Sequence, residues 1–164
     1  MTNNFNNEDK VVFLDIDGVL NSGLSLYSGQ YSHLKKWGID KNIISAYKKF
    51  SEKHNIKTVI ISTWRERAFG KNNEMEKIIL DESGIELKID GLTKNLDKKR
   101  GFEVELFIKE NNIKNYVIVD DQDNFLPSQQ ERFIKTDIAL GMTLYDIKKM
   151  ASILNIIDLE LKFL

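Results

Sequence analysis

The chain has 164 residues, of which 41% are hydrophobic and 30% charged, and its formal net charge is −1. This length predicts one globular domain, since the apolar content is far above that of a disordered chain. The composition excludes membrane spans, which need an apolar run of about 20 residues, and disulfides or thiolate metal sites, which need cysteine. The near-neutral charge also disfavours a surface that binds nucleic acid by bulk electrostatics.

The first nine residues are polar and rich in asparagine, and we expect them to form a flexible arm before a single domain over residues 10–164. They contain neither the basic stretch nor the apolar stretch of a secretory signal, which predicts a cytoplasmic protein. The rest of the chain has one proline, no low-complexity block and no internal repeat, so no domain boundary is indicated.

Three short runs are apolar on both faces rather than alternating, which is typical of strands buried in a parallel sheet. Each run stops abruptly at a polar side chain: residues 11–14 stop at Asp15, residues 58–61 at Ser62 and residues 116–119 at Asp120. Residues 87–89 and 132–135 are weaker candidates for further strands. The runs therefore predict a buried sheet with polar groups at the ends of its strands.

Helical spacing of apolar residues predicts three helices, over residues 42–54, 102–111 and 143–154. Thr143 is a candidate N-cap of the last one, with Asp146 as its capping-box partner. The apolar residues 154–164 can pack either on the domain or against a partner. Because strands alternate with helices, we expect an α/β fold with a Rossmann-like doubly wound parallel sheet and helices on both faces.

The polar groups that follow the strands are the informative feature, because ligands of open α/β sheets bind at the carboxyl ends of the strands. Crowded carboxylates repel one another unless a cation lies among them, and oxygen-only ligands suit Mg²⁺ together with substrate phosphate. A carboxylate can attack phosphorus, a second one can protonate the leaving oxygen, and basic residues at a helix N-terminus can hold a phosphate. The pattern therefore indicates phosphoryl transfer.

The motifs DIDGVL, IIST, a basic residue that opens a helix, and VIVDD occur in this order. They resemble the four motifs of the haloacid dehalogenase (HAD) superfamily of phosphatases, from Val11 to about Asp121. A narrower resemblance, to roughly Thr143, is carried by STWRE, KRGFEVELFIKE, YVIVDDQDNF and FIKTDIALGMT. These segments are similar to the short HAD domain of Swiss Army knife RNA-repair proteins.

The resemblance implies a role for each matching residue. Asp15 would be the nucleophile, and Asp17 the general acid and later the base, with its backbone carbonyl on the metal. Ser62, or less favourably Thr63, would bond the phosphoryl oxygens. Mg²⁺ is the implied cofactor, and its ligands would include Asp15. Of Asp120 and Asp121, one would bind it directly while the other lies close by or acts through water. The phosphate clamp stays open among three neighbours, of which Arg100 or Lys99 is favoured over Lys98.

The spacing between the motifs leaves no room for an inserted cap domain, so we expect an open site that can admit a large substrate. By resemblance, the leading substrate is a phosphate at an RNA end. Gly18, Thr63 and Lys98 are expected beside it, and Trp64 and Arg65 could stack on a base and hold a phosphate. Ordinary core packing is the competing interpretation of Trp64. Four residues of a presumed flap are further candidates for substrate contact: Tyr27, Tyr31, His33 and Trp37.

Other interpretations stay open. Ser62 could be a helix N-cap, and residues 120–121 a simple turn. A receiver domain also gathers acids at a sheet edge, although its acid pair comes first and its phosphoacceptor later. The prediction is a Mg²⁺-dependent phosphomonoesterase of this superfamily. The alternatives are a small-molecule or protein phosphatase, and a phosphoacceptor or phosphate-binding module without turnover.

Overall fold

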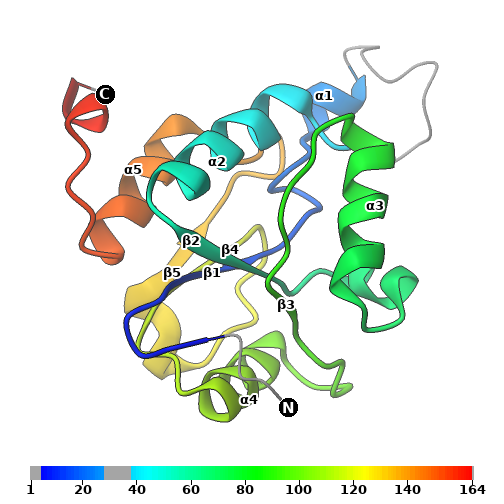
Figure 1. Ribbon diagram of the computed structural model, residues 1–164. Helices are drawn as coiled ribbons and strands as arrows, with labels where there is room; N and C mark the ends of the chain where they lie inside the picture. The colour runs from blue at the N-terminus through cyan, green and yellow to red at the C-terminus, as the bar shows by residue number, and fades with distance from the viewer. Residues whose placement is uncertain (1–4, 28–37, 164) are drawn as a thin grey trace.

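The computed structural model describes residues 5–27 and 38–163, which form one parallel sheet flanked by helices (Figure 1). The strands lie in the order β3-β2-β1-β4-β5, and every neighbouring pair is parallel. Their bounds are Lys10–Leu14 for β1, Ile56–Ile60 for β2, Gly91–Leu92 for β3, Asn115–Asp120 for β4 and Phe133–Lys135 for β5. This arrangement confirms the predicted doubly wound α/β fold.

The helices connect these strands. The α-helices are α1 Gly23–Tyr27, α2 Lys41–Lys53, α3 Asn72–Ser83, α4 Arg100–Asn111 and α5 Leu144–Ile153. The described residues also contain three short 3-10 helices: η1 Thr63–Ala68, η2 Pro127–Arg132 and η3 Leu159–Phe163. The three predicted helices correspond to α2, α4 and α5, and Thr143 with Asp146 forms the expected capping box of α5.

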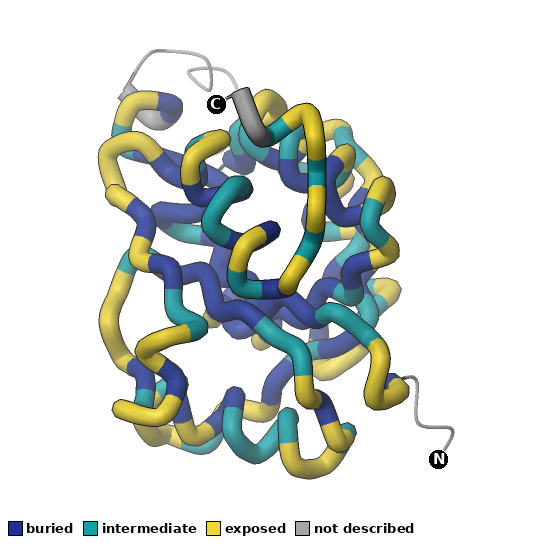
Figure 2. Tube along the Cα trace, turned by 90° about the vertical axis from the view of Figure 1, so that its left-hand side faces the viewer, coloured by how far each residue is buried: buried dark blue, intermediate teal, exposed yellow. Residues whose placement is uncertain are grey.

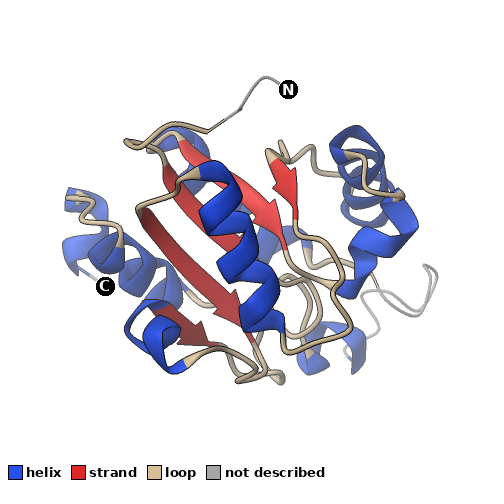
Figure 3. Ribbon diagram, turned by 90° about the horizontal axis from the view of Figure 1, so that it is seen from below, coloured by secondary structure: helices blue, strands red, loops and turns tan. Residues whose placement is uncertain are grey.

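Alternate residues of the strands feed two separate cores, because successive side chains of a strand point to opposite faces. On one face, Leu14 and Val119 pack with α2, α3 and α5. On the other face, Phe13 and Ile118 pack with α4. Figure 3 shows α4 lying across its own face of the sheet, and Figure 2 shows the buried segments of the chain surrounded by exposed segments. Both faces are therefore covered, as continuous apolar runs require.

One predicted strand is wrong. Residues 87–89 belong to no strand, and the short β3 begins at Gly91. The apolar pattern has another cause, since Leu87 and Ile89 are buried in the core beneath α3 as part of an extended loop. The backbone N–H of Ile89 donates to the Glu76 carboxylate, 2.9 Å away, instead of to a strand.

The two ends of the described chain are attached to the domain. Phe5 is buried and meets Phe107 edge-to-face, with ring centroids 5.5 Å apart, so packing begins within the expected arm of residues 1–9. Near the other end, Asp158 forms ion pairs with Lys53 and His54 of α2 and its C-terminal cap. Among the described residues, no helix has the length and apolarity needed to cross a membrane.

Candidate active site

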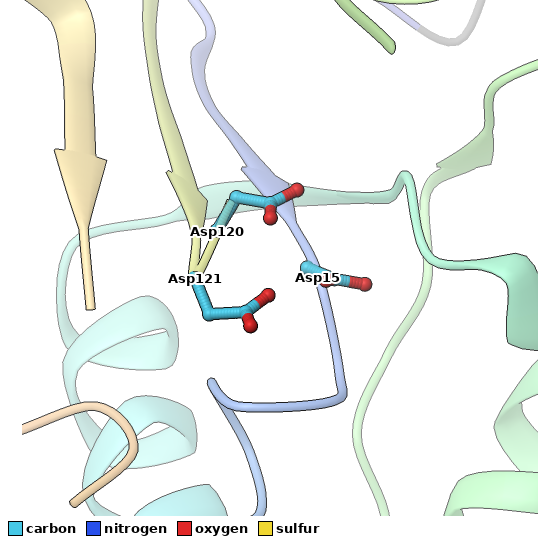
Figure 4. Close-up of side chains that lie close together, drawn as sticks. All are labelled: Asp15, Asp120 and Asp121. Carbon is cyan, nitrogen blue, oxygen red and sulfur yellow. The ribbon is translucent and has the colours of Figure 1, made fainter. Parts of the chain in front are cut away.

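Three aspartates lie together at the carboxyl edge of the sheet. Asp15 follows β1, Asp120 is the last residue of β4 and Asp121 follows it. One carboxylate oxygen of each lies within 4.8 Å of the others. Figure 4 shows the carboxylates of Asp120 and Asp121 turned toward the end of β1. Asp15 and Asp120 are buried, and Asp121 is half-buried. The central strands β1 and β4 therefore deliver the acidic cluster that the sequence predicted at this edge.

Of the three basic residues at positions 98–100, Arg100 is the one whose side chain reaches the acidic cluster. Its Nη1 lies 2.9 Å from Oδ2 of Asp15 and also donates to Oδ2 of Asp120. It is the first residue of α4, so the helix start carries it to the strand ends. Lys98 and Lys99 are exposed.

The carboxylate oxygens of the acidic cluster differ in whether they have hydrogen-bond partners. Asp120 has both oxygens engaged, one by Arg100 and one by the backbone N–H of Gln122, 2.8 Å away. The Oδ1 of Asp15 is buried and finds no hydrogen-bond partner among the described residues. A buried, unpaired carboxylate oxygen is costly unless a cation meets it. The donor set consists of oxygens only, which suits a hard divalent cation such as Mg²⁺.

The proton affinities of the acidic cluster reflect this crowding. Burial, followed by the negative charge of Asp15, raises the pKa of Asp120 from 3.8 to about 7, although Arg100 opposes the shift. The same two causes raise the pKa of Asp121. For Arg100, burial lowers the pKa, but Asp15 and Asp120 together outweigh it and the net shift is upward. One guanidinium therefore does not neutralise the three acids.

Asp17 and Gly18 occupy the loop that leaves β1. The two carboxylate oxygens of Asp17 each accept a hydrogen bond, one from Asn21 and one from the indole of Trp64. Gly18 has a φ of +71°, and a Cβ added there would lie 2.7 Å from the Cβ of Asp121. The glycine thus allows the loop to approach the acidic cluster, which a larger residue would prevent.

Ser62 and Thr63 follow β2 at the same edge. Ser62 is buried and caps η1, its Oγ accepting from the backbone N–H of Trp64 at 3.4 Å. The N-cap interpretation of Ser62 is therefore confirmed. Thr63, the less favoured candidate, is exposed.

Trp64 and Arg65 lie inside the domain rather than on its surface. Trp64 is 6% exposed, and Arg65, also 6% exposed, pairs with Glu103 of α4 at 2.7 Å. Arg65 further donates to the carbonyls of Ile61 and Ser62. Burial lowers the pKa of Arg65, while the charge of Glu103 raises it. These side chains join the segment after β2 to the rest of the site, and they offer no open surface on which a base could stack.

Two residues that build the site were assigned no role from the sequence. Asn21 accepts from the Gly18 N–H at 2.8 Å and donates to Asp17 at 2.9 Å. Glu103 pairs with Arg65 and accepts from the Leu96 N–H at 3.2 Å. The signal for Glu103 is present in the Arg-Gly-x-Glu pattern that opens α4, because its glutamate lies one turn after Arg100 and reaches the segment that follows β2.

The glycine of that pattern has a packing role. A Cβ on Gly101 would lie 2.7 Å from the backbone N of Leu126 and from Oε1 of Gln129. The Gly101 N–H donates to the Asn124 carbonyl at 3.0 Å, and the Gln129 amide donates to the Gly101 carbonyl at 2.9 Å. Close packing of the helix start against the 124–129 loop thus holds Arg100 at the acidic cluster.

Most of the presumed flap lies outside the part of the chain that the structure describes. Tyr31, His33 and Trp37 lie outside the described residues, as does the side chain of Tyr27. Between Gly18 and Arg100, the described chain consists of α1, α2, β2, η1, α3 and β3, with no inserted domain among them.

Comparison with known proteins gives one match. The family model described as the HAD domain in Swiss Army Knife RNA repair proteins matches residues 11–147. No curated protein and no solved structure matches the chain. The matched region runs from β1 into α5 and includes every strand and the whole acidic edge. With so much of the chain covered by that one model, the chain belongs to the family of HAD domains found in Swiss Army Knife RNA repair proteins.

Proposed function

We propose that the protein is a Mg²⁺-dependent phosphomonoesterase that works through an aspartyl-phosphate on Asp15. The observation that carries this proposal is the buried Oδ1 of Asp15, which lacks a hydrogen-bond partner among the described residues and lies in a cluster with Asp120 and Asp121. A buried carboxylate oxygen that accepts no hydrogen bond is available both to a cation and to an electrophilic phosphorus. Membership of the HAD family supports a hydrolase of this superfamily.

The residues of the acidic cluster fit a divalent cation. Asp15 and Asp121 would hold it through carboxylate oxygens, and the Asp17 backbone carbonyl would join them by resemblance to the superfamily. Asp120, with both oxygens engaged by Arg100 and Gln122, would act through water or through Arg100. When bound, the cation supplies charge neutralisation for the nucleophile and the phosphoryl oxygens.

Arg100 and Ser62 would bind the transferring phosphoryl group. The ion pair of Arg100 with Asp15 supports Arg100, rather than Lys98 or Lys99, as the clamp. A guanidinium can offer two parallel N–H groups to phosphate oxygens, which an ammonium cannot. Ser62 is buried beside the same strand ends, where its hydroxyl could donate to an oxygen of phosphate.

The reaction would take place in two steps. First, an Asp15 oxygen bonds to phosphorus while the ester P–O bond breaks, and Asp17 gives its proton to the leaving oxygen. Next, water attacks the phosphorus of the aspartyl-phosphate, Asp17 accepts the proton of that water, and inorganic phosphate leaves with Asp15 regenerated. Asp17 thus acts once as acid and once as base.

The substrate class that we propose is a phosphate at an RNA end, in the cytoplasm. The family description supports it, as does the absence of an inserted cap among the described residues, because an open edge admits a terminal phosphate on a polymer. A small-molecule or protein phosphatase, and a phosphate-binding module without turnover, are the outcomes that the experiment must separate.

The test is hydrolysis of an aryl phosphate and of phosphate-ended oligoribonucleotides, with Mg²⁺ and then with excess chelator. We expect metal-dependent release of phosphate that is lost in Asp15→Asn. The matched control is Asp123→Asn, because Asp123 is an exposed acid after β4 that bonds Gln130 outside the acidic cluster. Failure of wild type to hydrolyse any substrate would reject the proposal, as would full activity of Asp15→Asn.

A further inference from the structure

The carboxylate of Asp17 is held from two sides by hydrogen bonds to different segments of the chain. Its Oδ1 accepts from Nδ2 of Asn21 at 2.9 Å, and its Oδ2 accepts from Nε1 of Trp64 at 2.9 Å. Asn21 belongs to the same loop as Asp17, whereas Trp64 follows β2. The indole N–H therefore connects the loop after β1 to the segment after β2.

Trp64 is itself firmly placed. Its side chain is buried in the core with Leu14 and Met75, and its backbone N–H is bonded to the Ser62 hydroxyl. The guanidinium of Arg67 lies 5.0 Å from the ring centroid on an exposed side chain. Packing and the backbone hydrogen bond fix the orientation of the indole, so its single N–H points toward Asp17.

The contact leaves Asp17 able to move a proton. A carboxylate oxygen has two acceptor positions, so one N–H on each oxygen leaves room for a proton and for a hydrogen bond to the leaving oxygen. The hydrogen bonds from Asn21 and Trp64 restrict rotation of the Asp17 carboxyl group. Efficient proton transfer needs the acid within hydrogen-bond reach of the leaving oxygen, and a supported side chain loses less freedom on reaching that geometry.

We propose that Trp64 is a positioning residue that orients the general acid Asp17 through its indole N–H. This inference rests on the proposed phosphatase function and extends it to a residue that touches neither the phosphate nor the metal. It replaces a stacking role for Trp64, since a side chain that is 6% exposed offers no face to a nucleotide base. Packing alone would not require an N–H at this position, because phenylalanine fills a core as well.

The experiment compares two substrates in the variant Trp64→Phe, which keeps an aromatic ring and removes the N–H. A ribose phosphate at an oligonucleotide end has a poor leaving group and needs a proton donor, whereas p-nitrophenyl phosphate needs almost none. We expect kcat/KM on the oligonucleotide to fall about 10- to 100-fold, less than the roughly 10²- to 10⁴-fold that a general acid supplies in full, because the variant misaligns the acid without removing it. On the aryl phosphate we expect a fall of less than about 3-fold.

Arg67→Ala is the matched control. It removes the cation from the same indole and leaves the N–H to Asp17 intact, so the ratio of the two substrates should stay at the wild-type value. An equal loss on both substrates in Trp64→Phe would overturn the positioning role and leave the phosphatase proposal standing. If wild type hydrolyses neither substrate, the proposed function itself fails.

A second measurement keeps the inference open to refutation even if Trp64→Phe folds poorly. The chain has two tryptophans, Trp37 and Trp64, so the indole N–H resonance that remains in Trp37→Phe is that of Trp64. In Asp17→Ala, which keeps Trp64 but removes its acceptor, this resonance should move upfield and exchange faster with solvent. An unchanged resonance would show that the indole does not bond Asp17.

Discussion

Two acidic regions of the molecule are built in opposite ways. In the acidic cluster at the sheet edge, Arg100 forms ion pairs with two of the three clustered aspartates, Asp15 and Asp120. Beside the C-terminal segment, Asp158 pairs with Lys53 at 3.0 Å and with His54 at 2.7 Å, and Lys53 also pairs with Glu160 at 3.0 Å. Negative charge exceeds positive charge in the first region, whereas in the second each carboxylate oxygen of Asp158 meets a partner of its own.

The pKa values follow this difference. Burial and the charge of Asp15 raise the pKa of Asp120 to about 7, while hydrogen bonds from His54 and then Lys53 lower the pKa of Asp158 to about 2. A structural ion pair favours its charged form, as Asp158 does. At the sheet edge, burial and crowding disfavour the ionised form of Asp120 and Asp121. Such raised pKa values are common in functional sites, where a bound cation can supply positive charge. We infer that the acidic cluster is arranged to bind a cation, whereas the ion pairs of Asp158 attach the C-terminal segment to α2.

The largest difference is expected in activity. Asp15→Asn removes the proposed nucleophile and should lower phosphate release by roughly 10⁴-fold or more. Asp158→Asn, the same chemical change in the other region, should leave the rate at the wild-type level. Both variants are assayed on an aryl phosphate with Mg²⁺. Comparable losses in the two variants would contradict the separation of roles.

The next largest effect is expected on stability. Arg100→Ala leaves three crowded carboxylates without their cation, and loss of one partner of a buried pair costs about 3 kcal/mol. Urea denaturation in the absence of metal measures this cost, and Mg²⁺ should restore part of it. If Arg100→Ala is as stable as wild type, Arg100 is not needed to offset the acids.

Metal binding should distinguish the two regions as well. Mg²⁺ that binds only the folded state stabilises it by about 2.7 kcal/mol at 100 times its dissociation constant. The rise in Tm with Mg²⁺ should disappear in Asp121→Asn and persist in Asp158→Asn. A rise that survives Asp121→Asn would place the cation away from the acidic cluster.

The pH dependence of metal-free stability should also separate the two regions, because its sign is opposite in each. The pKa of Asp158 is lower in the folded state than its ordinary value of 3.8, so its stabilisation is complete above about pH 4 and is lost as the pH falls toward 2. The pKa of Asp120 is raised instead, so its unfavourable contribution is absent below about pH 4 and grows as the pH rises through 7.

Urea midpoints between pH 2 and pH 8 measure both trends. Asp158→Asn should flatten the curve below pH 4, and Asp120→Asn should flatten it between pH 4 and pH 7. Each variant should leave the other part of the curve unchanged, because the two regions lie at different places in the fold. Loss of both trends in one variant would mean that the regions are coupled.

Much of the fold could be predicted because the buried parallel strands carry a strong signal. Runs that are apolar on both faces marked β1, β2 and β4, and the polar residues after them marked the active edge. The short β3 could not be placed this way, since a two-residue strand has no periodicity and the apolar residues 87–89 are buried for a different reason. Periodicity reports burial, and only backbone pairing distinguishes a strand from a buried loop.

For the site, residue types at strand ends predicted the acids, but partners could not be assigned from one chain. The choice among Lys98, Lys99 and Arg100 depends on which side of the α4 start faces Asp15. The burial of Arg65 depends on Glu103, 38 residues away in the sequence. Such contacts are set by how a helix packs across the sheet, and a linear pattern does not contain that information.

The position of Asp15, the proposed nucleophile, directly after the central strand β1 has a consequence for the folding kinetics. Asp15 and Asp120 are about a hundred residues apart in the sequence, and they meet only where β1 pairs with β4. Pairing across so long a stretch of chain carries a large loop-closure cost and forms slowly. An acidic cluster that closes after the rate-limiting step would give Mg²⁺ nothing to bind on the way to the native state. The cation would then lower the unfolding rate and lengthen the lifetime of the native state, while the folding rate would stay unchanged.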